Sequence, residues 1–210
     1  MSTIVKVVDV CPQQILSFNA PNDLTQDALK NVLQEEWQRN DNNYYTQDTF
    51  LHRKQQYKHL TSWFNDCLQH VARCKRYMFH GEFTITQCWA NKTTTNGSHH
   101  IHNHPNSLLS GIFYLNDSTP TRFISPAVWD VPLIQSMNEE LTSSTVPSEC
   151  GKLLIFPSTL LHGTDAHTTT EDRYSMSFNT FIQGELGDVS SLDYVSINNV
   201  EYNSFDNEWT

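Results

Sequence analysis

After residue 80 the chain changes from helical periodicity to a series of short β-rich segments, which limits the folds it can adopt. Turn residues such as Asn-Gly, Asn-Asp-Ser and Pro separate these segments. Several short strands at this spacing, preceded by helices, predict a β-sandwich or barrel with helices covering one sheet. The segments are EFTITQCWANK, LLSGIFYLN, TRFISP, GKLLIFPS and RYSMSFNTFI.

Two amphipathic helices are expected before this β-rich region. The first covers residues 22–37, where Asp23 is suited to cap the helix and Gln26 follows three residues later, as in a capping box. The second covers residues 47–74 and carries apolar residues at steps of three, four and seven, which predicts one face packed on a sheet. An opening strand is expected in TIVKVVDV, close to the first residue.

The chain has 210 residues and 24.2 kDa, which favours one domain over two. Within it we expect a helical buttress at residues 22–74, a β core at 80–187 and a polar, acidic tail at 188–210. Hydrophobic residues make up 38% of the chain, which is typical of a globular protein rather than a disordered one.

Charge and cysteine content exclude some functions and suggest a compartment. The net charge of −10, without a basic cluster, argues against a protein that binds duplex nucleic acid. No secretory signal or membrane-spanning apolar run is recognisable. Five cysteines without a C-x-x-C pair fit a reduced, cytoplasmic protein. The sequence leaves the oligomeric state open.

Histidines are concentrated in the stretch GSHHIHNHPN. Alternate residues of a strand share a face, so His100, His102 and His104 would share one if the strand began early enough. Neutral imidazole is a good ligand for first-row metals, but a His-x-His pair needs a third group. His162, after the apolar segment KLLIF, is the candidate. His99 and His100 are expected in a solvated loop.

A strict alternation of side chains marks RYSMSFN. Arg173 and Ser175 fall on one face with Ser177 and Asn179, and the apolar residues fall on the other. Inside a barrel with a polar pocket, such a polar face can point inward. An arginine supported by a hydroxyl two residues on is suited to hold a carboxylate. Trp89 and Trp129 are expected to pack in the core or at its rim.

Together these motifs resemble those of the iron(II)/2-oxoglutarate-dependent oxygenases. The segments HNHPNSLLSGIFYL, GKLLIFPSTLLHGT and RYSMSFNTFIQGELG resemble in particular a bacterial and phage group within that superfamily, whose members show H-x-H-P, F-P-S…H and R-x-S-x-S-F-N runs. The resemblance covers residues 80–187. It implies a double-stranded β-helix, the jelly roll, with the helices buttressing it.

The resemblance also implies a chemistry. Protein side chains hold Fe(II), which also binds the two cosubstrates, 2-oxoglutarate and O2. In the reaction 2-oxoglutarate is decarboxylated to succinate while a substrate is oxidised, usually by hydroxylation. Carried over by position, His102 and His162 are iron ligands, and Arg173 with Ser175 binds the distal carboxylate of 2-oxoglutarate. Tyr114 has the same parity as the histidines and is a candidate to face the cosubstrate. Small molecules and peptides are the implied substrates.

One position departs from the superfamily pattern. The superfamily has Asp or Glu where this chain has His104. His104 is therefore either the third metal ligand or a residue that contacts the ligands without binding the metal. The spacing of Asp117 and Asp165 in the sequence does not indicate either carboxylate as the third metal ligand. Two alternative functions stay open on the sequence. They are a three-histidine metal dioxygenase that does not use 2-oxoglutarate, and a catalytically silent jelly roll that binds a metal or ligand.

Overall fold

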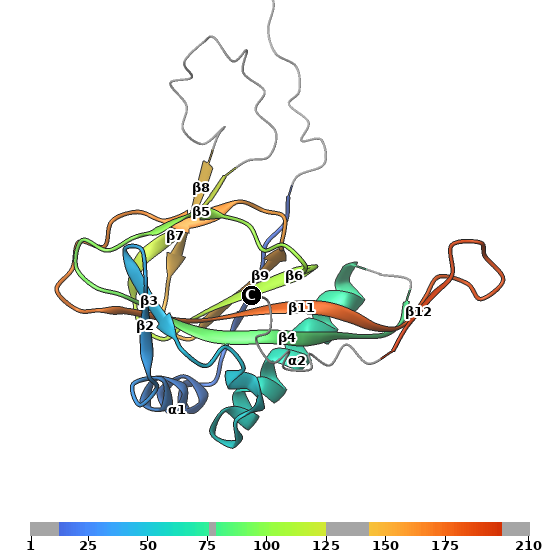
Figure 1. Cartoon of the computed structure of the whole chain (residues 1–210), viewed down its shortest axis with the longest axis horizontal. Helices are drawn as coiled ribbons and strands as arrows, with labels where there is room; N and C mark the ends of the chain where they lie inside the picture. The colour runs from blue at the N-terminus through green and yellow to red at the C-terminus, as the bar shows by residue number, and fades with distance from the viewer. Residues whose placement is uncertain (1–12, 76–78, 125–142, 199–210) are drawn as a thin grey trace, which may run out of the picture.

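Two antiparallel β-sheets face one another, and two helices cover the outer side of the larger sheet (Figure 1). The computed structural model describes residues 13–75, 79–124 and 143–198. The opening strand predicted near the N-terminus, Trp129 and the last part of the predicted tail lie outside these residues.

The larger sheet has eight strands. Its central strands are covered on both faces, which explains why β6 is buried throughout and mostly apolar. In order across the sheet, the strands are β1 (Leu16–Asn19), β9 (Lys152–Pro157), β6 (Leu109–Tyr114), β11 (Arg173–Leu186), β4 (Phe79–Thr93), β3 (Asn43–Thr46) and β2 (Trp37–Asn40), and β12 (Val195–Ile197) pairs with β11.

The smaller sheet has four strands. In order they are β5 (His99–His102), β10 (His162–Thr164), β7 (Ser118–Ile124) and β8 (Ser143–Ser148). The predicted jelly roll is therefore confirmed. Three of these strands, β5, β8 and β10, are short or polar and were not among the segments that the sequence identified.

The main hydrophobic core lies between the larger sheet and the helices α1 (Asn22–Val32) and α2 (Lys58–Lys75). Phe64 of α2 contacts Phe178 of β11 and Phe113 of β6, with ring centroids 4.9 and 5.6 Å away. The apolar face of β11 therefore points to the helices, as the alternation in RYSMSFN predicts. Its polar face points between the two sheets, where the site forms.

Both helices are shorter than the sequence predicts. The first ends at Val32 because Glu35 turns inward to accept hydrogen bonds from Lys54 and Tyr57. Trp37 then pairs with Thr46 in the β2–β3 hairpin. The predicted cap is also wrong, since Pro21 is the N-cap residue and no side chain caps the helix.

The second helix begins at Lys58 instead of residue 47. Asp48 accepts the backbone N–H of Phe50, and the Thr49 carbonyl accepts the N–H of Cys88, which holds this segment against β4. Two short 3-10 turns, Leu51–Arg53 and Gln55–Tyr57, follow before the helix starts. No helix in the described part of the chain is long and apolar enough to span a membrane.

Candidate active site

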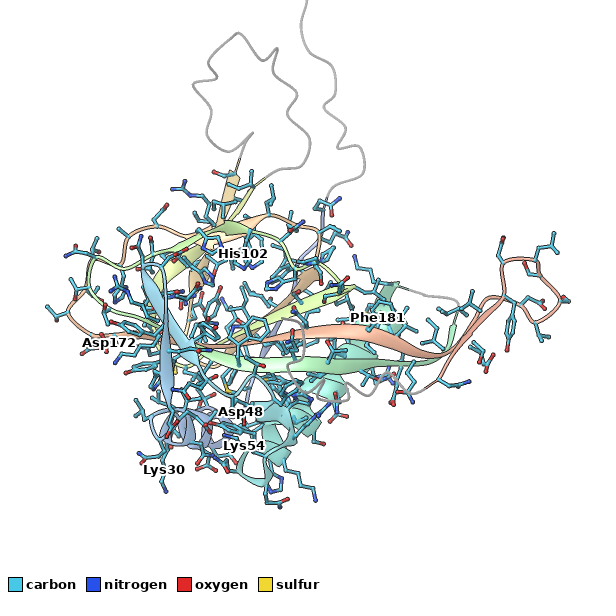
Figure 2. All side chains as sticks on the ribbon, in the orientation of Figure 1. Lys30, Asp48, Lys54, His102, Asp172 and Phe181 are labelled. Carbon is cyan, nitrogen blue, oxygen red and sulfur yellow. The ribbon has the colours of Figure 1, made fainter. Side chains whose placement is uncertain are left out.

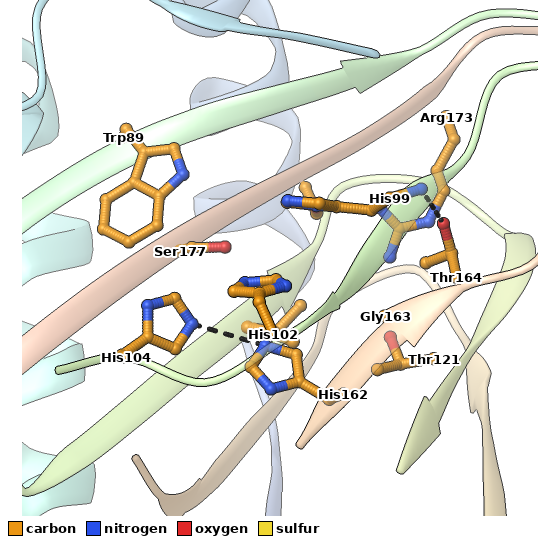
Figure 3. A pocket seen from close by; sticks show the side chains of 12 residues that line it. Trp89, His99, His102, His104, Thr121, His162, Gly163, Thr164, Arg173 and Ser177 are labelled. Carbon is orange, nitrogen blue, oxygen red and sulfur yellow. Dashed lines mark hydrogen bonds between the residues drawn. The ribbon is translucent and has the colours of Figure 1, made fainter. Parts of the chain in front are cut away.

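Strands β5, β10 and β11 bring the histidine-rich segment, the distal histidine and the buried arginine to one pocket (Figure 3). Figure 2 shows the place of His102 in the whole molecule. Side chains from both sheets line it, so the site depends on how the sheets face each other. The lining residues are Trp89, His99, His102, His104, Ile112, Thr121, His162, Gly163, Thr164, Arg173, Ser175 and Ser177.

Three histidines form a compact cluster at one end of this pocket. His102 and His162 are direct partners in the β5–β10 pair, so their side chains share a face, and their ring centroids lie 4.5 Å apart. His104 follows β5, and its backbone N–H donates to the Ser158 carbonyl. The ligand atoms of the three side chains lie within 4.8 Å of one another.

Hydrogen bonds fix which ring nitrogen of two histidines is free. Nδ1 of His102 lies 2.9 Å from the His100 carbonyl, and Nδ1 of His162 lies 3.0 Å from the Leu160 carbonyl. A carbonyl only accepts, so each Nδ1 carries the proton and each Nε2 keeps a lone pair. This is the tautomer and orientation that metal-binding histidines need.

The third histidine faces one of these lone pairs. Nε2 of His104 lies 3.3 Å from Nε2 of His162 (Figure 3). Imidazole nitrogens bound to one divalent metal at about 2.1 Å lie roughly 3 Å apart when their bonds are perpendicular. The donor set and the spacing therefore fit a first-row divalent metal such as Fe(II).

Burial keeps these imidazoles neutral. Burial, with a smaller contribution from neighbouring histidines, lowers the pKa of His162 to about 4 and the pKa of His104 to about 3, although the hydrogen bond to the Leu160 carbonyl opposes the shift at His162. The pKa of His102 is also lowered, mainly by burial, although its hydrogen bond to the His100 carbonyl opposes the shift. At neutral pH no proton competes with a metal for these nitrogens.

A buried cation lies in the same pocket. Arg173 is 4% exposed, and no carboxylate of the described residues pairs with it. Its Nη1 donates to Ser175 Oγ at 3.0 Å, and its Nε donates to the Thr119 carbonyl at 3.3 Å. Its remaining N–H groups donate to no other residue that the structure describes, so they can bind an anion. Because Ser175 Oγ accepts from the arginine, its own hydrogen is free to join them.

Tyr114 supports this arginine instead of opening to the pocket. Its side chain is fully buried, and its hydroxyl lies 2.7 Å from Thr121 Oγ1. The Arg173 guanidinium lies 5.5 Å from the centre of the Tyr114 ring, within cation–π range. Burial raises the pKa of Tyr114, so the phenol stays protonated. The cosubstrate role predicted for Tyr114 remains untested.

Strand parity in β5 differs from the expectation. His102 faces the pocket, but His100 is exposed, while His99, expected in solvent, lines the pocket. An irregularity in the β5–β10 register causes this change. Period-two reasoning could not anticipate it, because an irregularity leaves no mark on the histidine spacing.

Trp89 is held at the edge of the histidine cluster. Its ring centroid lies 5.8 Å from that of His104. Its Nε1 donates to Asn91 Oδ1, and Asn91 Nδ2 donates to Ser177 Oγ. Trp89 was expected in the core or at its rim, and the structure places it in the lining of the pocket. Asn91, which holds its indole, was not identified from the sequence.

The two aspartates that lie near the motifs in the sequence bind other residues and not the histidine cluster. Asp165 forms an ion pair with Arg122, and Asp117 accepts the backbone N–H of Cys150. In the described part of the chain, the groups of side chains that could hold a metal consist of histidines alone.

The lowered histidine pKa values predict a pH-dependent stability of the metal-free protein. Between about 4 and 6.5, the unfolded chain binds protons at His162 and the folded chain does not, so the free energy of unfolding falls as pH falls through this range. Urea unfolding at several pH values measures this fall. His162→Gln removes one contributing group and should make the fall shallower, whereas an unchanged slope would contradict the assignment.

The jelly roll, three clustered imidazoles and a buried arginine in one pocket are the features that the resemblance to iron(II)/2-oxoglutarate oxygenases implies. Residues 87–179 match the family model described as "Putative 2OG-Fe(II) oxygenase", a segment that contains all the predicted site residues. This match and the jelly-roll fold relate the chain to the 2-oxoglutarate/Fe(II) oxygenases, and some similar solved structures hold a metal and 2-oxoglutarate. No curated protein matches the chain in sequence.

Solved structures share the fold at low sequence identity. HygX from Streptomyces hygroscopicus, with nickel and 2-oxoglutarate bound, is 13% identical over 91% of this chain and 93% of its own, with a TM-score of 0.61. A Pseudomonas putida prolyl-4-hydroxylase is 11% identical over 82% and 94%, with a TM-score of 0.61. The epimerase SnoN from nogalamycin biosynthesis is 12% identical over 86% and 83%, with a TM-score of 0.62.

Proposed function

We propose that this protein is a hydroxylase that uses Fe(II), O2 and 2-oxoglutarate. The observation that supports the proposal is one pocket that can bind a cation at one end and an anion at the other. One end presents imidazole lone pairs to a cation, and the other presents a buried, unpaired guanidinium to an anion. A molecule with a metal-chelating end and a distal carboxylate satisfies both.

In this proposal His102, His104 and His162 hold the iron. The carbonyls of His100 and Leu160 keep two of these rings in the ligating tautomer. Fe(II), O2 and 2-oxoglutarate would together provide the oxidant for a substrate C–H bond, and 2-oxoglutarate would be converted to succinate and CO2. Trp89 lines the pocket beside the cluster.

Arg173 and Ser175 bind the distal carboxylate. A guanidinium presents two parallel N–H donors, which match the two oxygens of a carboxylate. Since the guanidinium is already oriented by Ser175, the Thr119 carbonyl and the Tyr114 ring, little ordering is needed on binding. The pocket is therefore preorganised for a dicarboxylate.

Small molecules and peptides are the proposed substrates. Among the similar structures, HygX is described with hygromycin B bound, and a Trichoplax adhaerens prolyl hydroxylase is described with a peptide fragment. Hydroxylation is the proposed outcome, although the similar fold of SnoN is described as that of an epimerase. Mass spectrometry of the product separates these outcomes, because hydroxylation adds one oxygen atom and epimerisation adds none.

An anaerobic titration tests the cosubstrate assignment. Protein reconstituted with Fe(II) is titrated with 2-oxoglutarate, and the weak visible charge-transfer band of a chelated 2-oxo acid is followed. Appearance of the band at one equivalent supports the proposal. Stoichiometric iron binding without a band contradicts it and favours the three-histidine dioxygenase, for which the all-histidine cluster is the specific observation.

His104→Ala is predicted to weaken metal binding at least about tenfold, because the variant loses one of three nitrogen donors. His104→Asp supplies a carboxylate oxygen at the same position and should retain most of the affinity. Competition with a metal-sensitive dye measures both values. His59→Ala is the matched control, since His59 is an exposed histidine on α2 that does not line the pocket. If His104→Ala binds metal as tightly as the unsubstituted protein, His104 is not a ligand.

A further inference from the structure

A β-bulge in β5 changes which histidine faces the pocket. His102 pairs with His162, and His99 pairs with Thr164, so three steps along β5 match two steps along β10. The extra residue reverses the alternation, which places His99 on the same side as His102 and leaves His100 and Ile101 exposed. Bulges beside active sites commonly redirect a side chain in this way.

Gly163 makes room for this bulge. A Cβ atom at this position would lie 2.7 Å from the His99 carbonyl oxygen and 2.8 Å from the His100 carbonyl oxygen. Any side chain would therefore push the bulged segment away from β10. The position of His99 thus depends on a close approach of two strands, directly beside the histidine cluster.

The His99 ring is held in place but keeps its polar atoms free. It stacks on the His102 ring with centroids 4.5 Å apart and an interplanar angle of 21°. The backbone N–H of His99 donates to Thr164 Oγ1 at 2.9 Å (Figure 3). The ring nitrogens make no hydrogen bond to another described residue. An oriented imidazole whose nitrogens bond to no described residue therefore lines the same pocket as Arg173.

We infer that His99 is a further 2-oxoglutarate-binding residue, which donates a ring N–H hydrogen bond to a carboxylate oxygen of the cosubstrate. The inference rests on the proposed function, because it assumes that the cosubstrate spans the pocket from the histidine cluster to Arg173. The rival role is a second metal site, since His99, His100 and His102 also have ligand atoms within 4.8 Å of one another. That group would have to share His102 with the first cluster.

Calorimetric titration of Ni(II)-loaded protein with 2-oxoglutarate tests the inference without turnover. His99→Phe keeps a flat ring on His102 but lacks the N–H. Loss of one hydrogen bond to a charged group is expected to weaken 2-oxoglutarate binding roughly tenfold or more. Nickel affinity should not change. His100→Phe is the matched control, because the same substitution falls on the exposed neighbour.

The possible results separate this inference from the function on which it rests. A dissociation constant for His99→Phe within twofold of the unsubstituted protein overturns the inference while the proposed function stands. A fall in nickel stoichiometry from two to one in both His99→Phe and His100→Phe overturns it in favour of the second metal site. If the unsubstituted Ni(II) protein does not bind 2-oxoglutarate, the proposed function fails, and the inference fails with it.

Discussion

Arg173→Ala is expected to abolish 2-oxoglutarate binding while leaving metal binding intact. In the proposed binding mode the variant would lose the guanidinium donors to the distal carboxylate, and Ser175 alone could not balance that charge in a buried pocket. Breaking a buried ion pair costs about 3–5 kcal/mol, so affinity should fall roughly 100-fold or more. Calorimetry with the Ni(II)-loaded protein measures the loss.

Arg173→Lys is the informative companion to this variant. Lysine keeps the positive charge but lacks the planar fork, so an intermediate affinity is expected. Far-UV circular dichroism and the nickel affinity show whether each variant is folded. A folded Arg173→Ala that binds 2-oxoglutarate within a few-fold of the unsubstituted protein would disprove the cosubstrate assignment.

His162→Ala is expected to weaken metal binding more than about 100-fold. Loss of residues that only orient a ligand already costs about 10- to 100-fold, and His162 is proposed to bind the metal directly, with its Nε2 3.3 Å from Nε2 of His104. Competition with a chelating dye measures the affinity. Activity should disappear with the metal.

His162→Gln separates the loss of a ligand from the loss of volume. His162 is 3% exposed, so alanine leaves a cavity against Phe123 and Phe156 that could itself destabilise the fold. Glutamine fills most of that space without an imidazole nitrogen. Equally weak metal binding in both variants supports ligation, whereas near-normal binding in His162→Gln would show that the residue only packs.

The sequence predicted those parts of the molecule whose pattern is set locally. β11 is covered by helices on one face and forms a polar pocket on the other, so its alternation in sequence identifies both faces correctly. The apolar run of β6 likewise reflects burial on both sides. Each pattern repeats over enough residues to be recognised without knowledge of its partners.

Features set by distant contacts were not predictable. The first helix ends early because Glu35 binds Lys54, which a helical periodicity cannot indicate. β10 has three residues, too few to show any alternation. The bulge that turns His99 inward depends on Gly163, which lies far from it in the chain. The histidine spacing alone also could not decide between ligation and support for His104, because that choice depends on the distance to His162.

The long pairing of β4 with β11 has a consequence for folding kinetics. These strands are far apart in the sequence, yet their register places Thr93 opposite Arg173 and Asn91 opposite Ser175. Such non-local contacts form slowly, because the chain loses entropy before they contribute energy. The pocket for the cosubstrate is therefore completed only when this ladder closes. A ligand that binds only after β4 and β11 have paired should therefore slow unfolding without accelerating folding.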